Sequence, residues 1–341
     1  MTLRPRGFAA LAAALLVSAG IVATPTVVAA DPPNGPPGTV ADGKWKDMAV
    51  KAYPDAAGAL FGLEATGGLV KAQYISGPAW AAGLQFGWND HRTQVWLKQI
   101  HQHRRPSGGY GSEEPFDAFA DRTTNDAQTT YTISTAWHIG QVFIPAYDAG
   151  AIPRKWIVDG VRTLLDTGED QGPAGPCIRY SMNPNDANQP CVYNVVAAAA
   201  WYLTEAAHRG LVPAGRTAEL WAKVARWTAT LRAAYNPAVG DWQYSSNQPI
   251  GTQEGPVYNE VIVMAMYALD RGFAEQATAA HFANWPTSTL ELISKDCSHA
   301  DAAYPIFEAA AIAPVPNLTA MVGRSIYATF GMLIHQECGG T

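Results

Sequence analysis

The stretch that decides the fold is Val195-Val-Ala-Ala-Ala-Ala-Trp-Tyr-Leu203, which has no polar face at all. A helix that is apolar on every side must be surrounded by protein. Similar apolar helices are expected at 131–147, 192–208, 257–270 and 318–335. Amphipathic helices are expected between them, at 154–166, 216–235 and 274–295, because their apolar residues recur at helical spacing on one face.

Buried and half-buried helices in alternation predict an inner ring of helices wrapped by an outer ring. A sequence repeat supports this pairing: Tyr180-Ser-Met-Asn183, Gln189 and Tyr193-Asn194 recur as Tyr244-Ser-Ser-Asn247, Gln253 and Tyr258-Asn259. A repeat of about 65 residues is typical of a helix pair that needs stacked neighbours to cover its apolar face. We therefore expect an all-α fold, an (α/α) toroid of five to six helical hairpins over residues 41–341. Helices at 45–53, 56–73 and 80–103 supply the first pairs, and an open helical solenoid is the alternative.

The chain begins with features of an export signal. Arg4 and Arg6 precede an apolar run, and Val28 and Ala30 occupy the small-residue positions of a cleavage site. A membrane anchor is the alternative, but Gly20 and the segment 24–26 interrupt the run before it reaches about 20 apolar residues. We expect a signal peptide at 1–30, cleaved near Ala30, then an exposed Pro/Gly-rich leader at 31–40. The mature protein is predicted to be secreted, with no membrane span.

Four cysteines follow residue 170, at positions 177, 191, 297 and 338. An even number in an exported protein favours disulfides, and four cysteines allow three connectivities. Pairing Cys177 with Cys191 and Cys297 with Cys338 is the most local choice. The sequence has neither a CxxC pair nor an HExxH motif, so no metal site is expected. No cofactor is expected either.

Loop lengths predict where a functional site lies. Connections from inner to outer helix are short, for example 150–153 and 210–213, whereas those that return are long: 105–130, 168–191, 236–256 and 296–317. Alternation of the helices puts all the long loops on one rim. Loops of more than about 12–15 residues are uncommon in compact domains unless they have a function.

The rim residues are those that a sugar needs. Aromatic rings stack on the apolar face of a sugar, while amide and carboxyl groups bond its hydroxyls. The expected substrate-binding residues are Tyr110, Arg179, Tyr180, Asn194, Trp242, Tyr244, Tyr258, Asn259 and Asp301. A glycosidase needs one protonated and one ionised carboxyl about 5–10 Å apart. The candidates are Asp117, Asp121, Asp241 and Glu254, although such residues in long loops also cap helices and close turns.

Two further catalytic candidates lie in the predicted inner helices. Glu260 comes one turn into an apolar helix, where burial would perturb its pKa; first-turn placement favoured by the helix dipole is the alternative. His138 comes two turns into another apolar helix, as a catalytic group or as a core histidine.

Charge restricts the partners. The formal net charge is −6, and the only local basic cluster is His101-Gln-His-Arg-Arg105. A nucleic-acid partner requires a positive stripe, so none is expected. A small molecule or an uncharged glycan is the expected substrate.

The order of glycine-rich loop, Tyr-led apolar helix and short Gly/Pro return resembles the six-hairpin glycosidase-like superfamily and related (α/α) toroids. This likeness covers most of the mature chain at the level of the fold. Cys177 with Gln189-Pro-Cys191, followed by Gly240-Asp-Trp-Gln-Tyr-Ser245, is also similar to linalool dehydratase-isomerase, an exported (α/α) enzyme of terpene alcohols. The histidine of that family has no match here, since Ser134 stands at its place and His138 lies one turn later. A further N-terminal cysteine of that family is also missing.

The sequence thus favours a secreted carbohydrate-active enzyme, a glycoside hydrolase acting on an extracellular or cell-wall polysaccharide. Three alternatives stay open. A polysaccharide lyase would use Arg179, Tyr180 and Asn194 around a uronate. A cofactor-free hydro-lyase or isomerase of a small terpene-like alcohol would use His138, Cys177 and Cys191. A non-catalytic module would only bind a glycan.

Overall fold

The computed structural model of the chain describes residues 79, 82, 83, 86–112, 115–248, 259, 261, 262, 265, 266 and 268–284, with residues 278–284 described by their backbone only. Several predictions therefore lie outside the described residues. These are the signal peptide at 1–30, the leader at 31–40, the helices at 45–53, 56–73 and 318–335, the loop at 296–317, and the roles of Glu254, Tyr258, Glu260, Cys297, Asp301 and Cys338.

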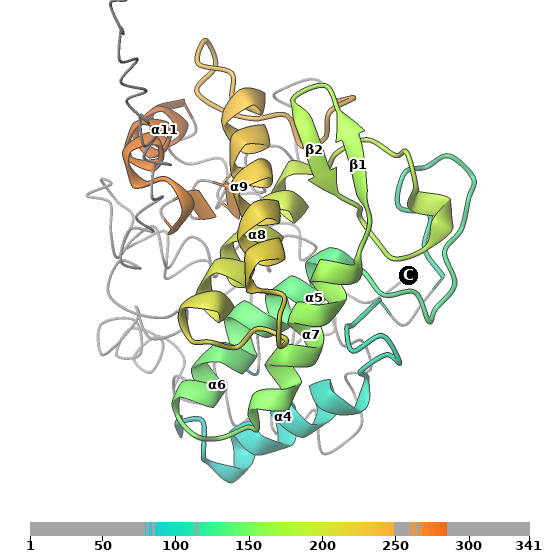
Figure 1. Ribbon diagram of the computed structural model, residues 1–341, viewed down its shortest axis with the longest axis vertical. Helices are drawn as coiled ribbons and strands as arrows, with labels where there is room; N and C mark the ends of the chain where they lie inside the picture. The colour runs from blue at the N-terminus through green and yellow to red at the C-terminus, as the bar shows by residue number, and fades with distance from the viewer. Residues whose placement is uncertain are drawn as a thin grey trace, which may run out of the picture.

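The described part is mostly helical (Figure 1). Its α-helices are α4 (His91–Gln102), α5 (Thr132–Trp137), α6 (Ile144–Asp148), α7 (Arg154–Asp166), α8 (Tyr193–His208), α9 (Thr217–Ala234) and α11 (Arg271–Asn284). A π-helical segment (His138–Phe143) joins α5 to α6, and a 3-10 turn spans Pro184–Asp186. The all-α prediction misses one small sheet, in which β1 (Glu169–Gly172) pairs antiparallel with β2 (Gly175–Ile178).

The α8 helix contains the stretch that has no polar face, and it is buried from Tyr193 to Ala206. It packs against α5 on one side and α9 on another. Gly140 in the π-helical segment permits close packing on α8, because a Cβ atom there would lie 1.8 Å from Cδ1 of Tyr202. The sequence prediction of a helix enclosed by protein is confirmed for α8.

The α7 and α9 helices are amphipathic and cover the buried ones. The α7 helix buries Ile157, Val161 and Leu164 against α5, and α9 buries Leu220, Trp227 and Leu231 against α8. The described residues thus contain two helix pairs, each with a buried and a partly exposed member. They do not show a closed ring.

The starts of two helices differ from the prediction. A single helix at 80–103 is interrupted at 87–90, because Gly87 has a φ of +90° and the Asp90 side chain caps α4 by accepting the N–H of Arg92 at 2.9 Å. The α11 helix begins at Arg271, three residues before the predicted start. Within the part of the chain that the structure describes, no helix has the length and apolar character needed to cross a membrane.

The long loops meet at the ends where α5 and α8 begin. Isolated β-bridges join Tyr110 to Tyr131, Tyr131 to Ser181, and Val192 to Ser245. The loop before α5, the loop between α7 and α8, and the loop after α9 are therefore neighbours in space. Figure 1 shows the first two of these loops side by side beyond the end of α5.

Candidate functional site

A buried carboxylate joins the first two long loops. Asp186 is 2 % exposed and accepts two hydrogen bonds from Nδ2 of Asn125, at 2.9 and 3.1 Å, and one from Oγ of Ser181 at 2.5 Å. Asn183 Nδ2 also donates to Oγ1 of Thr129 at 3.2 Å. Because these hydrogen bonds join the two loops, the loops form one surface. From here on, the rim means this surface, built from 115–131 and 179–191, and not all four of the predicted long loops.

Asp117 and Asp121 lie in one turn of the rim. Asp117 accepts the backbone N–H groups of Asp121 at 3.3 Å and of Arg122 at 2.9 Å. Asp121 is exposed, and its Oδ2 accepts Nε2 of Gln189 from the other loop at 2.6 Å. The hydroxyl and backbone N–H of Thr123 both donate to Asp121, and these bonds hold the pKa of that carboxyl below its usual value. Asp121 is therefore an ionised carboxylate at neutral pH.

The backbone of this region is strained. Among the described residues, the non-glycine positions with positive φ are Ala120 at 54°, Arg122 at 73° and Asn188 at 63°. All three flank the contact between Asp121 and Gln189. Residues other than Gly and Asn rarely adopt this backbone conformation. It costs on the order of 1 kcal/mol or more and tends to occur at functional sites.

Aromatic side chains run along the rim in edge-to-face contact. The ring of Tyr131 lies 6.1 Å from Phe116 and 5.8 Å from Tyr180, whose ring in turn lies 5.5 Å from Phe119. Phe116 is 43 % exposed, although burial of such a ring is strongly favoured. Phe116 is therefore an exposed ring at the outer end of this row, and sugar binding by the row stays a prediction.

Tyr110 and His138 lie together in the core beneath the rim. Both are fully buried, and their rings stack with centroids 4.5 Å apart. The His138 Nδ1 atom contacts the carbonyl of Ser134 one turn earlier. Glycine is required beside Tyr110, since a Cβ atom at 111 would lie 2.1 Å from the carbonyl oxygen of Thr129. Both side chains are thus enclosed by protein. A role of Tyr110 in substrate binding and of His138 in catalysis stays a prediction.

The second loop holds three more of the predicted residues. Arg179 pairs with Asp170 of β1 at 2.9 Å, and Tyr180 is half-buried in the aromatic row. Asn194, at the start of α8, is 4 % exposed, and its Oδ1 has no hydrogen-bond partner within the described protein. The predicted disulfide between Cys177 and Cys191 is confirmed, and it closes this loop at the end of β2.

The third loop is bound by backbone contacts. The side-chain Oδ1 of Asn259 accepts the backbone N–H of Trp242 at 3.2 Å, and its Nδ2 donates to the carbonyl of Trp242 at 3.0 Å. Trp242 is fully buried, and Asp241 is 1 % exposed with its Oδ1 on the N–H of Trp242 at 3.1 Å. Tyr244 is half-buried and accepts the N–H of Tyr193 through its carbonyl. The bond from Tyr193 holds the loop against the start of α8, and the bonds of Asn259 join the loop to residue 259.

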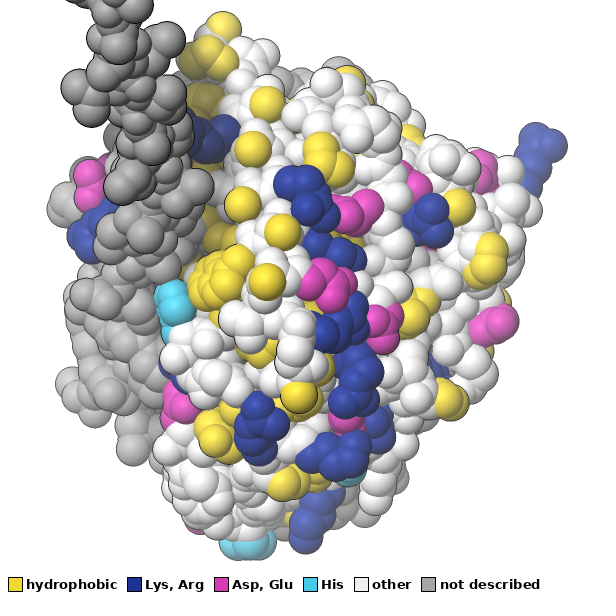
Figure 2. Space-filling model, viewed as in Figure 1, with side chains coloured by type: hydrophobic (Ala, Val, Ile, Leu, Met, Phe, Trp, Pro, Cys, Tyr) yellow, Lys and Arg dark blue, Asp and Glu magenta, His cyan; other side chains and the backbone are white. Residues whose placement is uncertain are grey.

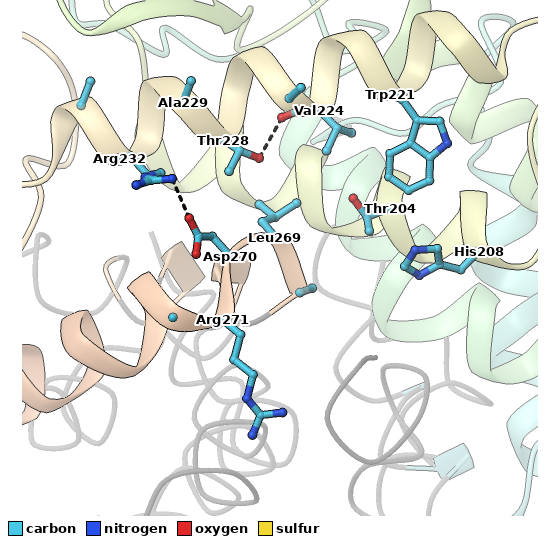
Figure 3. A pocket seen from close by; sticks show the side chains of 14 residues that line it. Thr204, His208, Trp221, Val224, Thr228, Ala229, Arg232, Leu269, Asp270 and Arg271 are labelled. Carbon is cyan, nitrogen blue, oxygen red and sulfur yellow. Dashed lines mark hydrogen bonds and ion pairs between the residues drawn. The ribbon is translucent and has the colours of Figure 1, made fainter. Parts of the chain in front are cut away.

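A separate groove of about 1330 Å³ runs along α9 (Figure 3). Small apolar residues dominate it, with Trp221, His208 and the Arg232–Asp270 ion pair at 2.9 Å among its polar and aromatic groups. None of the residues predicted from the sequence to carry chemistry lines this groove. The rim, not the groove, is therefore the candidate site.

Sequence reasoning missed the two residues that hold the rim together. Asn125 and Asp186 lie 61 positions apart, and neither belongs to the Tyr-Asn repeat. The π-helical segment under the rim was also missed, since its composition is that of an ordinary apolar helix. In the described residues no group of three or more His, Cys, Asp or Glu side chains is placed to hold a metal ion. No family model and no curated protein matches this chain.

Proposed function

We propose that this chain is a secreted carbohydrate-active enzyme that hydrolyses a glycan bound at the rim. The observation that carries the proposal is the turn at Asp121, an exposed carboxylate that Gln189 of the second loop binds and whose two neighbours, Ala120 and Arg122, have positive φ. The same loop carries the exposed ring of Phe116. Ring faces stack on sugars, and amides such as that of Gln189 bond hydroxyl groups. Backbone strain at this place favours a functional role for the turn over a purely structural one.

In this proposal Asp121 is the carboxylate that acts in its ionised form, as base or nucleophile. Glycoside hydrolysis also requires a protonated carboxyl on the other side of the scissile bond. Glu260, predicted from its position in an apolar inner helix, is the proposed acid, with Glu254 and Asp301 as alternatives. The complete fold that we propose is a toroid, in which further helix pairs continue the two that the structure describes.

The alternative that uses cysteine thiols is less favoured. Cys177 and Cys191 are 1 % and 2 % exposed and bonded to each other. A disulfide sulfur cannot act as a thiolate. We therefore retain hydrolysis in preference to dehydration or isomerisation of a small alcohol.

The test is release of reducing ends from a panel of neutral polysaccharides by the mature protein. Asp121→Asn should lower the rate by roughly 10²-fold or more, the usual effect of removing a catalytic acid–base group. The matched control is Asp166→Asn on the outer surface of α7, where the carboxylate is 46 % exposed. That variant should keep the wild-type rate.

Binding to the same polysaccharides in affinity gels separates the other functions. Phe116→Ala should weaken binding by about tenfold if the ring stacks on sugar. Binding that depends on Phe116 without any release of reducing ends would identify a glycan-binding module and refute the enzyme. Products that carry a new carbon–carbon double bond would identify a lyase. Full activity of Asp121→Asn would remove Asp121 from the mechanism.

A further inference from the structure

A band of Lys and Arg side chains runs down one face of the molecule, with Asp and Glu side chains between them (Figure 2). Ion pairs and hydrogen bonds join its members into two groups, one around Asp159 and one between the end of α7 and the start of α9. The cations are Arg104, Lys155, Arg162, Arg216, Lys223 and Arg226, and the carboxylates are Asp159, Asp166, Glu169 and Glu219. We call this set the basic band. Most of its members lie on α7 and α9, while Arg104 follows α4, Arg216 precedes α9 and Glu169 lies in β1.

One end of the band places three cations on one carboxylate. Asp159 is 3 % exposed at its side chain and binds Arg104 at 2.6 Å, Lys155 at 2.5 Å and Arg162 at 3.1 Å. A single negative charge cannot neutralise three positive ones. Two positive charges therefore remain at this point. Lys155 is 72 % exposed and Arg162 is 47 % exposed, so an external anion has access to them.

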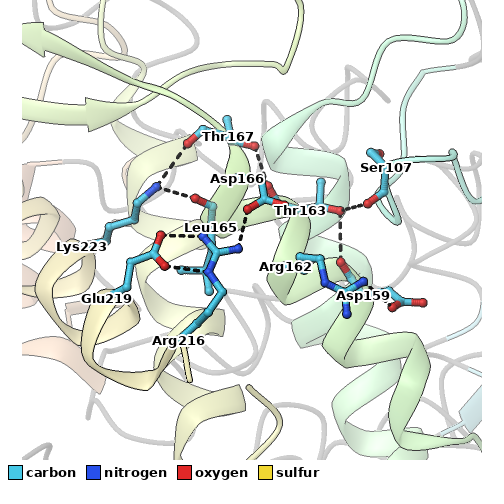
Figure 4. Close-up of polar contacts among 10 residues, drawn as sticks. All are labelled: Ser107, Asp159, Arg162, Thr163, Leu165, Asp166, Thr167, Arg216, Glu219 and Lys223. Carbon is cyan, nitrogen blue, oxygen red and sulfur yellow. Dashed lines mark hydrogen bonds and ion pairs between the residues drawn. The ribbon is translucent and has the colours of Figure 1, made fainter. Parts of the chain in front are cut away.

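The other end of the band links α9 to the end of α7 (Figure 4). Arg216 lies between Asp166 and Glu219 and donates to both. Lys223 is 9 % exposed and donates to the carbonyls of Leu165 at 2.7 Å and Thr167 at 3.3 Å. Arg226 pairs with Glu169 at 2.8 Å and is 45 % exposed. The paired cations are held in position, which lowers the entropy lost when an anion binds.

The balance of charge on this face is opposite to that of the whole chain. The basic band has six cations and four carboxylates, an excess of two positive charges, whereas the full chain carries −6. The excess lies at the Asp159 end, because three cations and three carboxylates balance one another at the other end. Lys155 and Arg162 both reach Asp159, so their charges lie close together on the surface. A polyanion is attracted to such a positive surface, because several of its charges can approach these cations.

The exposed side chains favour a polysaccharide over a membrane surface or a single-stranded nucleic acid. A protein that enters a membrane surface needs exposed large apolar groups, and single-stranded nucleic acid needs exposed rings for base stacking. Among the described residues, the exposed large hydrophobic side chains are Phe116 and Met182, and both belong to the rim. Trp156, next to Lys155, is half-buried and already stacked on His101 with ring centroids 3.8 Å apart.

We propose that the basic band binds an acidic polysaccharide and that this binding is separate from the rim. A secreted enzyme that acts on a neutral glycan would be held by this surface at a matrix that also contains anionic chains. The contacts are charge-assisted and exposed, with the unbalanced charge at Lys155 and Arg162. Binding is therefore weak at each contact, cumulative along the polymer and sensitive to salt.

The test uses dextran sulfate as the probe and neutral dextran as its uncharged equivalent. The wild-type protein should bind immobilised dextran sulfate at low ionic strength, be released by added salt, and not bind through this surface to neutral dextran. Lys155→Gln with Arg162→Gln should weaken the binding by about fivefold to tenfold at low salt, since each exposed charge contributes modestly. The equally charged control is Arg232→Gln with Arg271→Gln, whose side chains are 57 % and 53 % exposed outside the band.

The outcomes separate this proposal from the alternatives and from the rim. The control variant and Phe116→Ala should bind dextran sulfate as the wild type does. An equal loss in the control would show that only net charge matters and would overturn the band as a site. Failure of the wild type to bind dextran sulfate overturns the proposal, as does tighter binding to single-stranded DNA or to vesicles of anionic phospholipid. None of these results depends on whether the rim hydrolyses a glycan.

Discussion

At the scale of single residues, Gly140 sets how closely two buried helices pack. A Cβ atom there would meet the ring of Tyr202 at 1.8 Å, and the surroundings are fully buried. Gly140→Ala should lower the free energy of unfolding by about 1–3 kcal/mol, the usual cost of overpacking a core. Denaturant titration measures this change.

The control for this prediction is Gly272→Ala near the start of α11, where a Cβ atom would have nothing within 4 Å. Alanine is favoured over glycine in helices, so this variant should be neutral or slightly stabilising. Equal stability of both variants and the wild type would contradict the close contact between Gly140 and α8.

His101 predicts a dependence of stability on pH. Burial and the charges of Arg104 and Lys155 lower its pKa below the usual 6.5, while Asp159 opposes them. The unfolded chain therefore binds a proton at this position more readily than the folded chain. The contribution of the neutral His101 ring to the free energy of unfolding is complete above pH 6.5. It is lost as the pH falls through 6.5 toward the lower pKa of the folded chain.

His101→Gln should remove this part of the pH dependence. Free energies of unfolding measured between pH 7 and pH 5 should decrease less steeply in the variant than in the wild type. His91→Gln is the control, because that side chain is 76 % exposed. An unchanged slope in His101→Gln would show that burial of this ring does not affect its titration.

At the scale of elements, Lys223 connects α9 to the end of α7. Its ammonium group donates to the carbonyls of Leu165 and Thr167, which the last turn of α7 leaves without helical partners. A cation at this end also interacts favourably with the helix dipole. Lys223→Met keeps the apolar stem and removes the donor. The variant should lose about 1–3 kcal/mol of stability, because buried carbonyls are left unsatisfied.

Lys155→Met tests whether loss of a lysine charge alone explains such an effect. Lys155 is 72 % exposed and pairs with Asp159 one turn away on α7. Because the lysine is exposed and Asp159 keeps Arg104 and Arg162, loss of this contact should cost about 0–1 kcal/mol. Thermal unfolding should therefore show a clear decrease for Lys223→Met and little change for Lys155→Met. Similar decreases in both variants would contradict the role of Lys223 at the end of α7.

At the scale of the whole molecule, helical periodicity predicted the outer helices well. The expected helix at 154–166 has the bounds of α7, and 216–235 differs from α9 by one residue at each end. Local pattern determines these elements, since each has one apolar face. The β1–β2 hairpin could not be predicted in this way, because Glu169-Asp-Gln-Gly172 has no alternation of apolar and polar residues. Its stability comes from pairing with β2 and from the contact of β2 with α9.

The meeting of the long loops was predictable from the sequence, whereas the contacts between them were not. Long return loops predicted a shared rim, and the bridges from Tyr131 to Ser181 and from Val192 to Ser245 place three loops together. The partners within the rim depend on tertiary structure. Gln189 meets Asp121 across 68 positions, and the basic band gathers residues from three separate segments. The net charge of −6 gave no indication of such a band, because composition does not show which charges lie together on the surface.

The rim depends on Asp186 as a shared acceptor, which gives a prediction for the whole molecule. Asp186→Ala leaves Asn125 and Ser181 without their buried acceptor, at a cost of about 2–4 kcal/mol. Because the two loops are joined there, hydrogen exchange should accelerate in both 115–130 and 181–191 and stay slow in α7 and α9. Asp121→Ala, at an exposed position, should affect only the contacts of this carboxylate with Thr123 and Gln189. Acceleration confined to one loop, or spread over α7 and α9 equally, would show that Asp186 does not couple the loops as a unit.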